Sequence, residues 1–429
     1  MNWFSKLFRK EREVELDYPE QAETGTGLFL RHRAKAAVSR DKLPRFQSTV
    51  GGFDTRAVSS GADRLRAKLR TAFTPSHPVS DLRMFAGRTE VLSKLIRLIE
   101  DQQLHVVIYG DRGIGKTSLM HILSQLAEQA RYTVVYASCG SDTKFSDLFR
   151  TMASEIPLLY HTAYSPVDEE IERGGTLADT LPEGELTVAQ VSNVLGKIGG
   201  TRVLLIIDEF DRAESARLRE QVAELVKNIS DRSMVVQLVI AGVAANLTEL
   251  VAHIPSIRRN IIGLPIDAMM PAEVRELLSN GESASGLPFS PDAVDSVIAM
   301  SNGSPYLANL LGQHAGLAAT ERDAEKVSLA DVALGISRAI EEVRLRVSPH
   351  GLLAIKKLTE SVGLKKIGHL AELAMTHVGR IPADEISDDL AKKVADIIEP
   401  IEGEAANALA FREEALVPYV WLMSQVHRD

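Results

Sequence analysis

The sequence predicts an α/β protein, in which a parallel sheet flanked by helices is followed by an all-helical region and then by a winged helix. Strand-like apolar runs alternate with amphipathic helical segments from Phe85 to Leu264, which is the pattern of a parallel sheet covered on both faces. The glycine-rich stretch GDRGIGKT, residues 110–117, lies between one such run and one such helix. After Pro265 the strand-like runs stop, so we expect helices to follow.

Length and composition set broad limits on the protein. A chain of 429 residues is long enough for two or three domains, and its 45% hydrophobic and 25% charged residues are typical of a globular protein. A net charge of -9 gives the chain as a whole no attraction to nucleic acid or anionic lipid, so such binding would have to be local. Cys139 is the only cysteine, which excludes intrachain disulfides and cysteine-cluster zinc sites. With no membrane-length apolar stretch and no signal peptide, the chain is expected to be cytoplasmic.

Residues 1–80 lack sustained periodicity and are predicted to form a flexible arm. Within residues 1–12, aromatic and leucine side chains share one helical face with basic residues around it, which predicts a basic amphipathic helix. Such a helix would bind the inner face of the membrane, or dock on this protein or on a partner. The basic stretch from Arg31 to Arg45 is either a solvated tail or a phosphate contact.

The glycine-rich stretch has the spacing of a Walker A phosphate loop and therefore predicts a P-loop NTPase core, which we assign to residues 81–266. Its backbone N–H groups would cradle phosphate oxygens, Lys116 would reach the β and γ phosphates, and the Thr117 hydroxyl would bind Mg²⁺. The predicted nucleotide-binding residues of this loop are Gly110, Asp111, Arg112, Gly113, Ile114, Gly115, Lys116, Thr117 and Ser118. Residues 157–186 interrupt the core with glycines, prolines and many acids, and are predicted to be an acidic surface loop.

A second motif follows the apolar run from Val203 to Ile207, which predicts a central strand buried on both faces. The strand ends in the acidic run 208–211, DEFD. A carboxylate at the end of a strand close to the phosphate loop can hold Mg²⁺, which we assign to Asp208. The next carboxylate, Glu209, would polarise the attacking water. Together the two motifs predict an ATPase that uses Mg²⁺ and converts ATP to ADP and phosphate.

The rest of the chain is predicted to be helical. Residues 267–346 form an all-helical lid, in which Pro271 opens the first helix and Gly281 ends it. Residues 347–429 offer three helical stretches, a turn-rich apolar segment and a terminal helix, which favours a winged helix. Its stretch most like a recognition helix, 383–399, begins with acids that DNA would repel, so a protein partner is favoured over DNA. The lysines that could still contact phosphates are Lys356, Lys357, Lys365 and Lys366.

Three segments resemble the AAA+ ATPases of the origin-recognition type and the related signal-transduction ATPases with numerous domains (STAND). They are residues 85–88 (FAGR), the acidic run 208–211, and residues 303–305 (GSP) in the lid. The resemblance implies that Phe85, Gly87 and Arg88 lie beside the adenine and that Pro305 approaches the nucleotide from the lid. It also implies a nucleotide held between core and lid.

The same resemblance suggests further site residues. Asn246, near the end of the fourth strand, is the candidate sensor of the γ phosphate. Arg258 and Arg259, before the last strand, are either an arginine finger or a solvent-facing basic pair. Since a finger completes the site of a neighbouring copy, it would require a homo-oligomer.

The function favoured by these features is an ATP-hydrolysing molecular switch. Binding of Mg-ATP would close the core on the lid, the closed form would engage a protein partner or oligomerise, and hydrolysis by Glu209 would reset it. The alternative is an initiator-like DNA-binding ATPase that uses the winged helix and the basic arm.

Overall fold

The computed structural model describes residues 61–213, 215–250, 259–401 and 408–426. The predicted amphipathic helix at residues 1–12 and the basic stretch from Arg31 to Arg45 lie outside these residues. None of the helices in the described ranges combines the length and apolar composition that crossing a bilayer requires.

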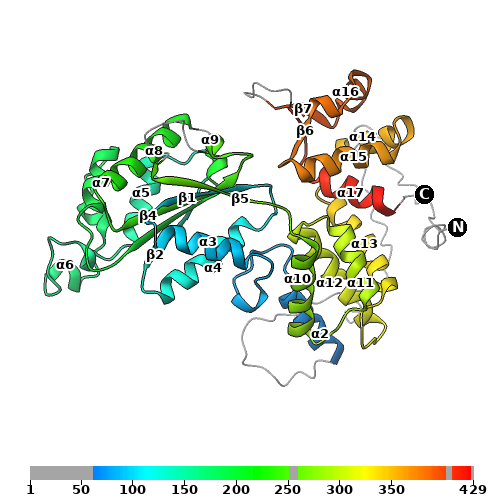
Figure 1. Ribbon diagram of the computed structural model, residues 1–429, viewed down its shortest axis with the longest axis horizontal. Coiled ribbons are helices and arrows are strands. Elements are labelled where there is room, and N and C mark those ends of the chain that lie inside the picture. The colour runs from blue at the N-terminus through cyan, green and yellow to red at the C-terminus, as the bar shows by residue number, and fades with distance from the viewer. Residues whose placement is uncertain (1–60, 214, 251–258, 402–407, 427–429) are drawn as a thin grey trace, which may run out of the picture. The chain divides into compact units, whose positions relative to one another are not determined.

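The core contains a parallel sheet with the strand order β2-β3-β4-β1-β5 (Figure 1). Each neighbouring pair of strands is parallel, as the alternation of strands and helices predicts. Because β4 alone separates β1 from β3, the segments that follow β1 and β3 leave the same edge of the sheet close together. The strands are β1 (His105–Gly110), β2 (Thr133–Ser138), β3 (Val203–Asp208), β4 (Val236–Val243) and β5 (Ile261–Ile266).

Helices cover both faces of this sheet, and the side chains of β3 alternate between the two apolar layers. Leu204 and Ile206 pack beneath the first layer of helices, whereas Leu205 and Ile207 pack beneath the second. The predicted burial of β3 on both faces is therefore confirmed. The first layer is α3 (Thr89–Glu100) and α4 (Lys116–Gln129), and the second is α5 (Phe145–Ser154), α7 (Val188–Leu195) and α8 (Ala216–Asp231) (Figure 1).

The segment 157–186 is more structured than the predicted surface loop. Most of the acids of the short helix α6 (Glu169–Glu172) are exposed, but Leu158 and Leu177 are fully buried. Both leucines join the apolar layer beneath α5, and each begins a short 3-10 helix. Apolar residues dispersed among the acids thus anchor the segment to the core.

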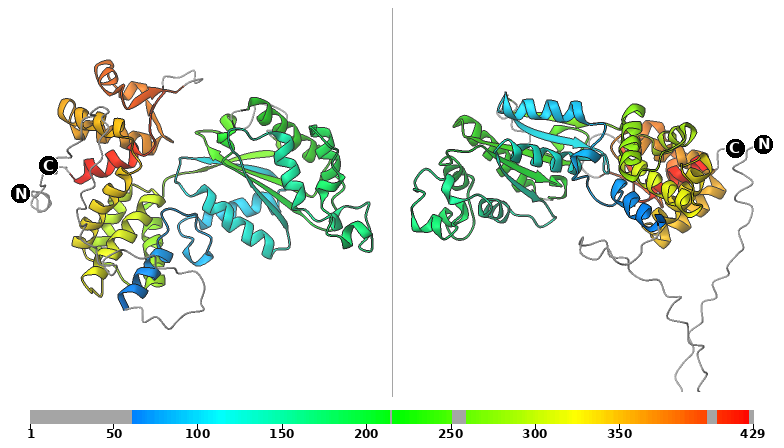
Figure 2. Two further views of the ribbon diagram at one scale, coloured as in Figure 1. Left: turned by 180° about the vertical axis from the view of Figure 1, so that it is seen from behind. Right: turned by 90° about the horizontal axis from the view of Figure 1, so that it is seen from below.

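The predicted extent of the N-terminal arm, 1–80, is wrong for residues 61–80. Residues 61–72 form helix α2 (Gly61–Ala72), which packs on the lid helices α10 and α12 (Figure 2). Leu69 and Phe73 are completely buried in this contact. Their partners lie some two hundred residues further along the chain, so local periodicity gives no sign of the packing.

The lid consists of α10 (Pro271–Ser285), α11 (Pro291–Ser301), α12 (Pro305–Glu321) and α13 (Leu329–Arg344). Helix α10 begins at Pro271 as predicted, but Gly281 does not end it. The helix continues to Ser285 and ends at Gly286, which takes a left-handed conformation with φ 79°. Position 281, inside the helix, requires a glycine because the Phe73 ring packs against it. A Cβ there would come within 2.2 Å of that ring.

The C-terminal region has helices on either side of a small antiparallel sheet of order β6-β8-β7. The stretch predicted as a recognition helix is broken, since only Asp388–Val394 is α-helical. Two strands and a terminal helix follow it. The elements are α14 (Pro349–Ser361), α15 (Leu364–Thr376), β6 (Arg380–Pro382), α16 (Asp388–Val394), β7 (Ile398–Pro400), β8 (Ala408–Phe411) and α17 (Leu416–Val426).

Candidate nucleotide-binding site

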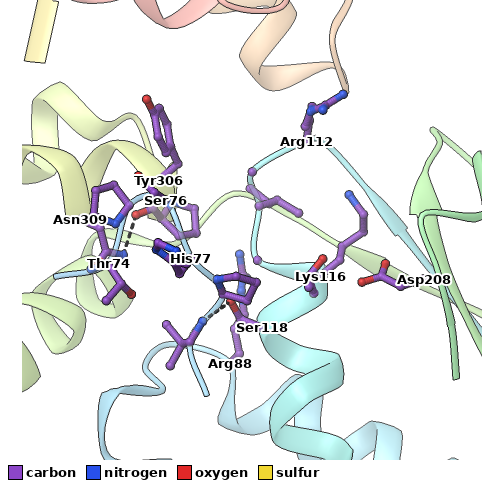
Figure 3. A pocket seen from close by; sticks show the side chains of 18 of the residues that line it. Thr74, Ser76, His77, Arg88, Arg112, Lys116, Ser118, Asp208, Tyr306 and Asn309 are labelled. Atoms are coloured by element: carbon purple, nitrogen blue, oxygen red, sulfur yellow. Dashed lines mark hydrogen bonds between the residues drawn. The ribbon is translucent and has the colours of Figure 1, made fainter. Parts of the chain in front are cut away.

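A cavity of about 310 Å³ lies at the edge of the sheet where β1, β3 and β4 end (Figure 3). Such a volume is within the range of small-molecule sites in proteins. The phosphate loop, the acidic run after β3, the lid and residues 74–79 all contribute to its walls. Of the predicted site residues, those that line it are Phe85, Arg88, Arg112, Gly113, Ile114, Gly115, Lys116, Thr117, Ser118, Asp208, Glu209 and Pro305.

The phosphate loop connects β1 to α4. Gly115 precedes the first helical residue and has φ 98°, a left-handed conformation that favours glycine. The Lys116 ammonium donates hydrogen bonds to the carbonyl oxygens of Gly110 at 3.0 Å and of Asp111 at 2.7 Å. Burial lowers the pKa of Lys116, while the carboxylates of Asp211, Asp111 and Asp208 oppose this shift. The loop therefore holds a buried cation at the start of a helix, where an anion is favoured.

The acidic run after β3 places two carboxylates on the same cavity. Asp208 is 2% exposed, and its Oδ1 accepts a hydrogen bond of 2.8 Å from the Glu209 backbone N–H. Glu209 has a left-handed backbone with φ 52°. Its carboxylate pairs with Arg212 at 2.9 Å and accepts a hydrogen bond from the Ser138 hydroxyl at 3.4 Å. Asp211 accepts a hydrogen bond from the backbone N–H of Val243 at 2.8 Å and so joins the ends of β3 and β4.

The residues that could hold a metal ion suit Mg²⁺ bound together with phosphate. Thr117 and Asp208 offer hydroxyl and carboxylate oxygens, the hard ligands that Mg²⁺ prefers. Within the described ranges no three His, Cys, Asp or Glu residues cluster around a potential metal position. This donor set therefore fits a cation that keeps waters and takes further ligands from phosphate, as Mg²⁺ commonly does.

The segment predicted to lie beside the adenine is held against the lid. The Gly87 N–H donates to the Glu276 carboxylate at 3.1 Å. Arg88 is 8% exposed and donates to the carbonyl oxygen of Asp267, yet its buried Nε has no hydrogen-bond partner. Burial lowers the pKa of Arg88, against the opposing charges of Glu273 and Asp267. Arg88 thus lines the cavity with a polar atom still unsatisfied, while Gly87 lies behind the lining.

Residues 73–80 form a strap that crosses from the lid to the core and lines the cavity, and no sequence motif marks it as part of the site. At the lid end, Asn309 accepts from the Thr74 N–H at 3.3 Å and Gln313 donates to the Phe73 carbonyl at 2.6 Å. At the core end, Ser118 accepts from the Val79 N–H at 3.0 Å. The side chains of Thr74, Ser76 and His77 surround the same space (Figure 3).

The lid contributes Pro305 and its neighbours at the start of α12. Ser304 caps the helix by accepting a hydrogen bond from the Leu307 N–H at 3.3 Å. Gly303 precedes it with φ 72°, and a Cβ there would lie 2.7 Å from the Met269 carbonyl oxygen. Only glycine fits at this approach of α12 to the segment before α10. The turn brings Pro305 and Tyr306 to the cavity, with Asn309 one helical turn further on.

The structure does not bring the other predicted site residues into the cavity lining. Asn246 donates a hydrogen bond to the Glu249 carboxylate and does not line the cavity. Gly110 and Asp111 form the base of the phosphate loop, behind the lining residues. Arg259 is exposed, and Arg258 lies outside the described residues.

Comparison with known proteins bears directly on this site. Residues 99–251 match the AAA domain family, and this range contains both the phosphate loop and the acidic run. The core of this chain is therefore similar to AAA domains. The predicted resemblance to AAA+ ATPases and the predicted P-loop NTPase fold are therefore confirmed. No curated protein sequence matches the chain.

Several solved structures are similar to the chain at low sequence identity. The Walker-type ATPase PABY2304 of Pyrococcus abyssi is 15% identical with a TM-score of 0.50, over 81% of this chain and 98% of that one. Cdc6p from Pyrobaculum aerophilum is 15% identical with a TM-score of 0.44, over 83% and 97%. The RuvB Holliday junction branch migration motor of Thermotoga maritima is 15% identical with a TM-score of 0.42, over 80% and 96%.

Among the described residues, two ion pairs join the C-terminal region to the core. Arg112 of the phosphate loop pairs with Glu414, and both side chains are largely exposed. Arg380 at the start of β6 makes two hydrogen bonds to Glu249, of 3.1 and 2.7 Å. The Arg380 and Glu249 side chains are only 22% and 27% exposed. The second pair is therefore better shielded from solvent than the first.

Proposed function

We propose that this chain is an ATP-hydrolysing molecular switch that couples binding of Mg-ATP between its AAA domain and lid to engagement of a protein partner or of further copies of itself. One observation carries the proposal. The phosphate loop, the carboxylates after β3 and the start of α12 line a single cavity of about 310 Å³.

The two ends of the cavity differ in chemistry, as an adenine nucleotide requires. Lys116, the loop N–H groups and the carboxylates supply the polar end, where phosphates and Mg²⁺ would bind. Thr117 and Asp208 would hold the Mg²⁺, which would neutralise phosphate charge when bound. Apolar side chains also line the cavity and would suit the adenine base. They belong to Met84, Phe85, Ala86, Met269 and Leu277.

Hydrolysis would depend on Glu209. Its carboxylate lines the cavity and would accept a proton from the attacking water as general base. In the described conformation that carboxylate pairs with Arg212. Glu209 would therefore have to leave this pair, at least in part, before it could orient water. Since both side chains are largely exposed, the pair is weak enough to exchange.

The lid and the strap supply the coupling. Pro305, Tyr306 and Asn309 line the cavity from the lid, so a bound nucleotide would contact both domains. A ligand that binds the closed arrangement better than the open one shifts the population towards closure. The closed form would present the surface that a partner binds. An arginine finger at Arg258 or Arg259 would extend this coupling to a homo-oligomer.

Paired substitutions test the proposal. Lys116→Ala removes the phosphate-binding cation and should abolish binding of a fluorescent ATP derivative. Glu209→Gln should bind this derivative with Mg²⁺ as tightly as the unsubstituted protein but lose phosphate release by about a hundredfold or more, the scale of a lost general base. Undiminished phosphate release by purified Glu209→Gln would overturn the catalytic assignment.

The second candidate is an initiator-like ATPase that binds DNA through a C-terminal winged helix and the basic arm. It is supported by the lysines of α14 and α15, which are exposed on consecutive helices. The exposed acids Asp388 and Asp389 at the start of α16 argue against it, because the DNA backbone would repel them. DNA binding through these lysines should weaken steeply as salt rises. The absence of a mobility shift with duplex DNA at low salt and saturating Mg-ATP would exclude this candidate.

A further inference from the structure

We infer that Tyr136 is a positioning residue, which holds the carboxylate of Asp208 in the orientation needed to bind Mg²⁺. This inference rests on the proposed function, because it concerns the magnesium end of the same site. It is carried by the register of two strands, by a hydrogen bond to the carboxylate, and by a ring stack against the helix of the phosphate loop.

The strand register puts Tyr136 and Asp208 on one face of the sheet. In the parallel pair of β2 and β3, Tyr136 is opposite Ile206 and Ser138 is opposite Asp208. Side chains two residues apart share a face, so Tyr136 and Asp208 both lie on the face that carries Ile206. That face is covered by α3 and α4, the second of which begins at the phosphate loop.

The Tyr136 hydroxyl donates a hydrogen bond to Oδ2 of Asp208, while the Glu209 N–H donates to Oδ1. Each oxygen of this 2% exposed carboxylate therefore has one donor within the protein. Because an ionised carboxylate oxygen can accept two hydrogen bonds or ligands, each retains room for one more. The two donors fix the plane of the carboxylate and leave its outer lone pairs for a cation or for the waters around it.

The Tyr136 ring is itself held from α4. It stacks on the His121 ring, with 5.1 Å between the ring centroids and 8° between the planes. His121 lies four residues after Thr117 on α4, so the two side chains share one face of that helix. Thr117, proposed to bind Mg²⁺, is thereby connected through α4, His121 and Tyr136 to Asp208, the other proposed ligand. This chain of contacts would keep the two ligands at a constant separation.

Substitution Tyr136→Phe separates a positioning role from a purely structural one, since it removes the hydroxyl and keeps the ring that stacks on His121. Binding of a fluorescent ATP derivative is measured in EDTA and across a MgCl₂ titration. We expect the affinity in EDTA to be unchanged within twofold. The Mg²⁺ concentration for half-maximal enhancement of binding should rise about tenfold, because hydrogen bonds to charged groups are among the stronger ones.

Two further variants make the result specific. Tyr132→Phe removes a phenol that accepts a hydrogen bond from Arg202 just before β2, and should leave the Mg²⁺ titration unchanged. In an Asp208→Asn background, Tyr136→Phe should have no further effect on the titration, because the carboxylate it orients is gone.

An unchanged Mg²⁺ titration of Tyr136→Phe would overturn the inference, as would an equal loss of affinity with and without Mg²⁺, which indicates a structural role. A tenfold effect that persists in the Asp208→Asn background would also overturn it. If the unsubstituted protein binds no nucleotide, or binds it without regard to Mg²⁺, the proposed function fails instead.

Discussion

At the scale of single residues, the phosphate loop surrounds its lysine with carbonyl oxygens and carboxylates. The Lys116 ammonium is held by carbonyl oxygens of Gly110 and Asp111, and its nearest opposing charges belong to Asp211, Asp111 and Asp208. Burial raises the pKa of Asp111 from 3.8 to about 6. The Arg112 N–H and the Lys116 charge oppose this rise, and Glu414 adds to it.

The raised pKa of Asp111 predicts how the stability of the nucleotide-free protein depends on pH. The folded protein binds the Asp111 proton more tightly than the unfolded chain does. The contribution of Asp111 to the free energy of unfolding is therefore fully present below pH of about 4 and is lost as the pH rises through about 6. Asp111→Asn should therefore be more stable than the unsubstituted protein above pH 6, with the advantage shrinking towards pH 4. Urea unfolding from pH 4 to pH 8 measures this difference. Parallel pH profiles would contradict the prediction, and Asp142→Asn is the solvent-exposed control.

At the scale of elements, the sequence predicts best where the cause of a structure is local. The phosphate loop, the acidic end of β3 and the start of α10 at Pro271 all follow from residues that are neighbours in the chain. Helix α2 and the length of α10 were mispredicted because their cause is distant. The Phe73 ring packs where Gly281 and Gly312 leave space, and those glycines come from two other helices.

This packing predicts an unusual effect of alanine in a helix. Gly312→Ala raises helix propensity by about 1 kcal/mol, yet a Cβ there would lie 2.7 Å from the Phe73 ring. Overpacking of this kind costs about 1–3 kcal/mol, so after the gain in propensity a net destabilisation of up to about 2 kcal/mol is expected in urea unfolding. Phe73→Leu in the same protein should restore part of the loss.

The matched control for Gly312→Ala is Gly61→Ala, at the start of α2, where a Cβ would meet nothing within 4 Å. This variant should be neutral or slightly stabilising. A Gly312→Ala protein as stable as the Gly61→Ala protein would show that the Phe73 ring moves aside at no cost.

At the scale of the whole molecule, the sequence motifs identified the phosphate loop, the acidic run and the segments at Phe85 and Pro305, but not the strap that lines the same cavity. The strap 73–80 carries no motif, and its contacts reach Asn309 and Gln313 in the lid. The pair between Arg380 and Glu249 likewise joins segments 131 residues apart. Such contacts depend on how the parts of the chain pack together, which local patterns do not encode.

The pair of Arg380 and Glu249 predicts measurable coupling between the C-terminal region and the core. Burial raises the pKa of Glu249, but hydrogen bonds from Arg380, the Ala245 N–H and Asn246 outweigh this effect and lower it. A double-mutant cycle with Arg380→Ala and Glu249→Ala should give a coupling energy of about 1–2 kcal/mol in unfolding measurements.

The control for this cycle is the exposed pair of Arg275 and Asp295, whose side chains are 55% and 67% exposed. Its coupling should stay below about 0.5 kcal/mol. Equal coupling in the two cycles would mean that partial burial of the Arg380 pair adds nothing to its strength.

The attachments of the strap also limit how far the lid can travel. Phe73 is buried in the lid, and the Val79 N–H donates a hydrogen bond to Ser118 of α4. Six residue steps of fully extended chain span at most about 20 Å, and Pro75 and Pro78 further restrict the conformations of the chain between them. While both attachments persist, the distance between Phe73 in the lid and Val79 on the core cannot exceed the extended length of the strap. The strap therefore sets an upper limit on how far the lid can open.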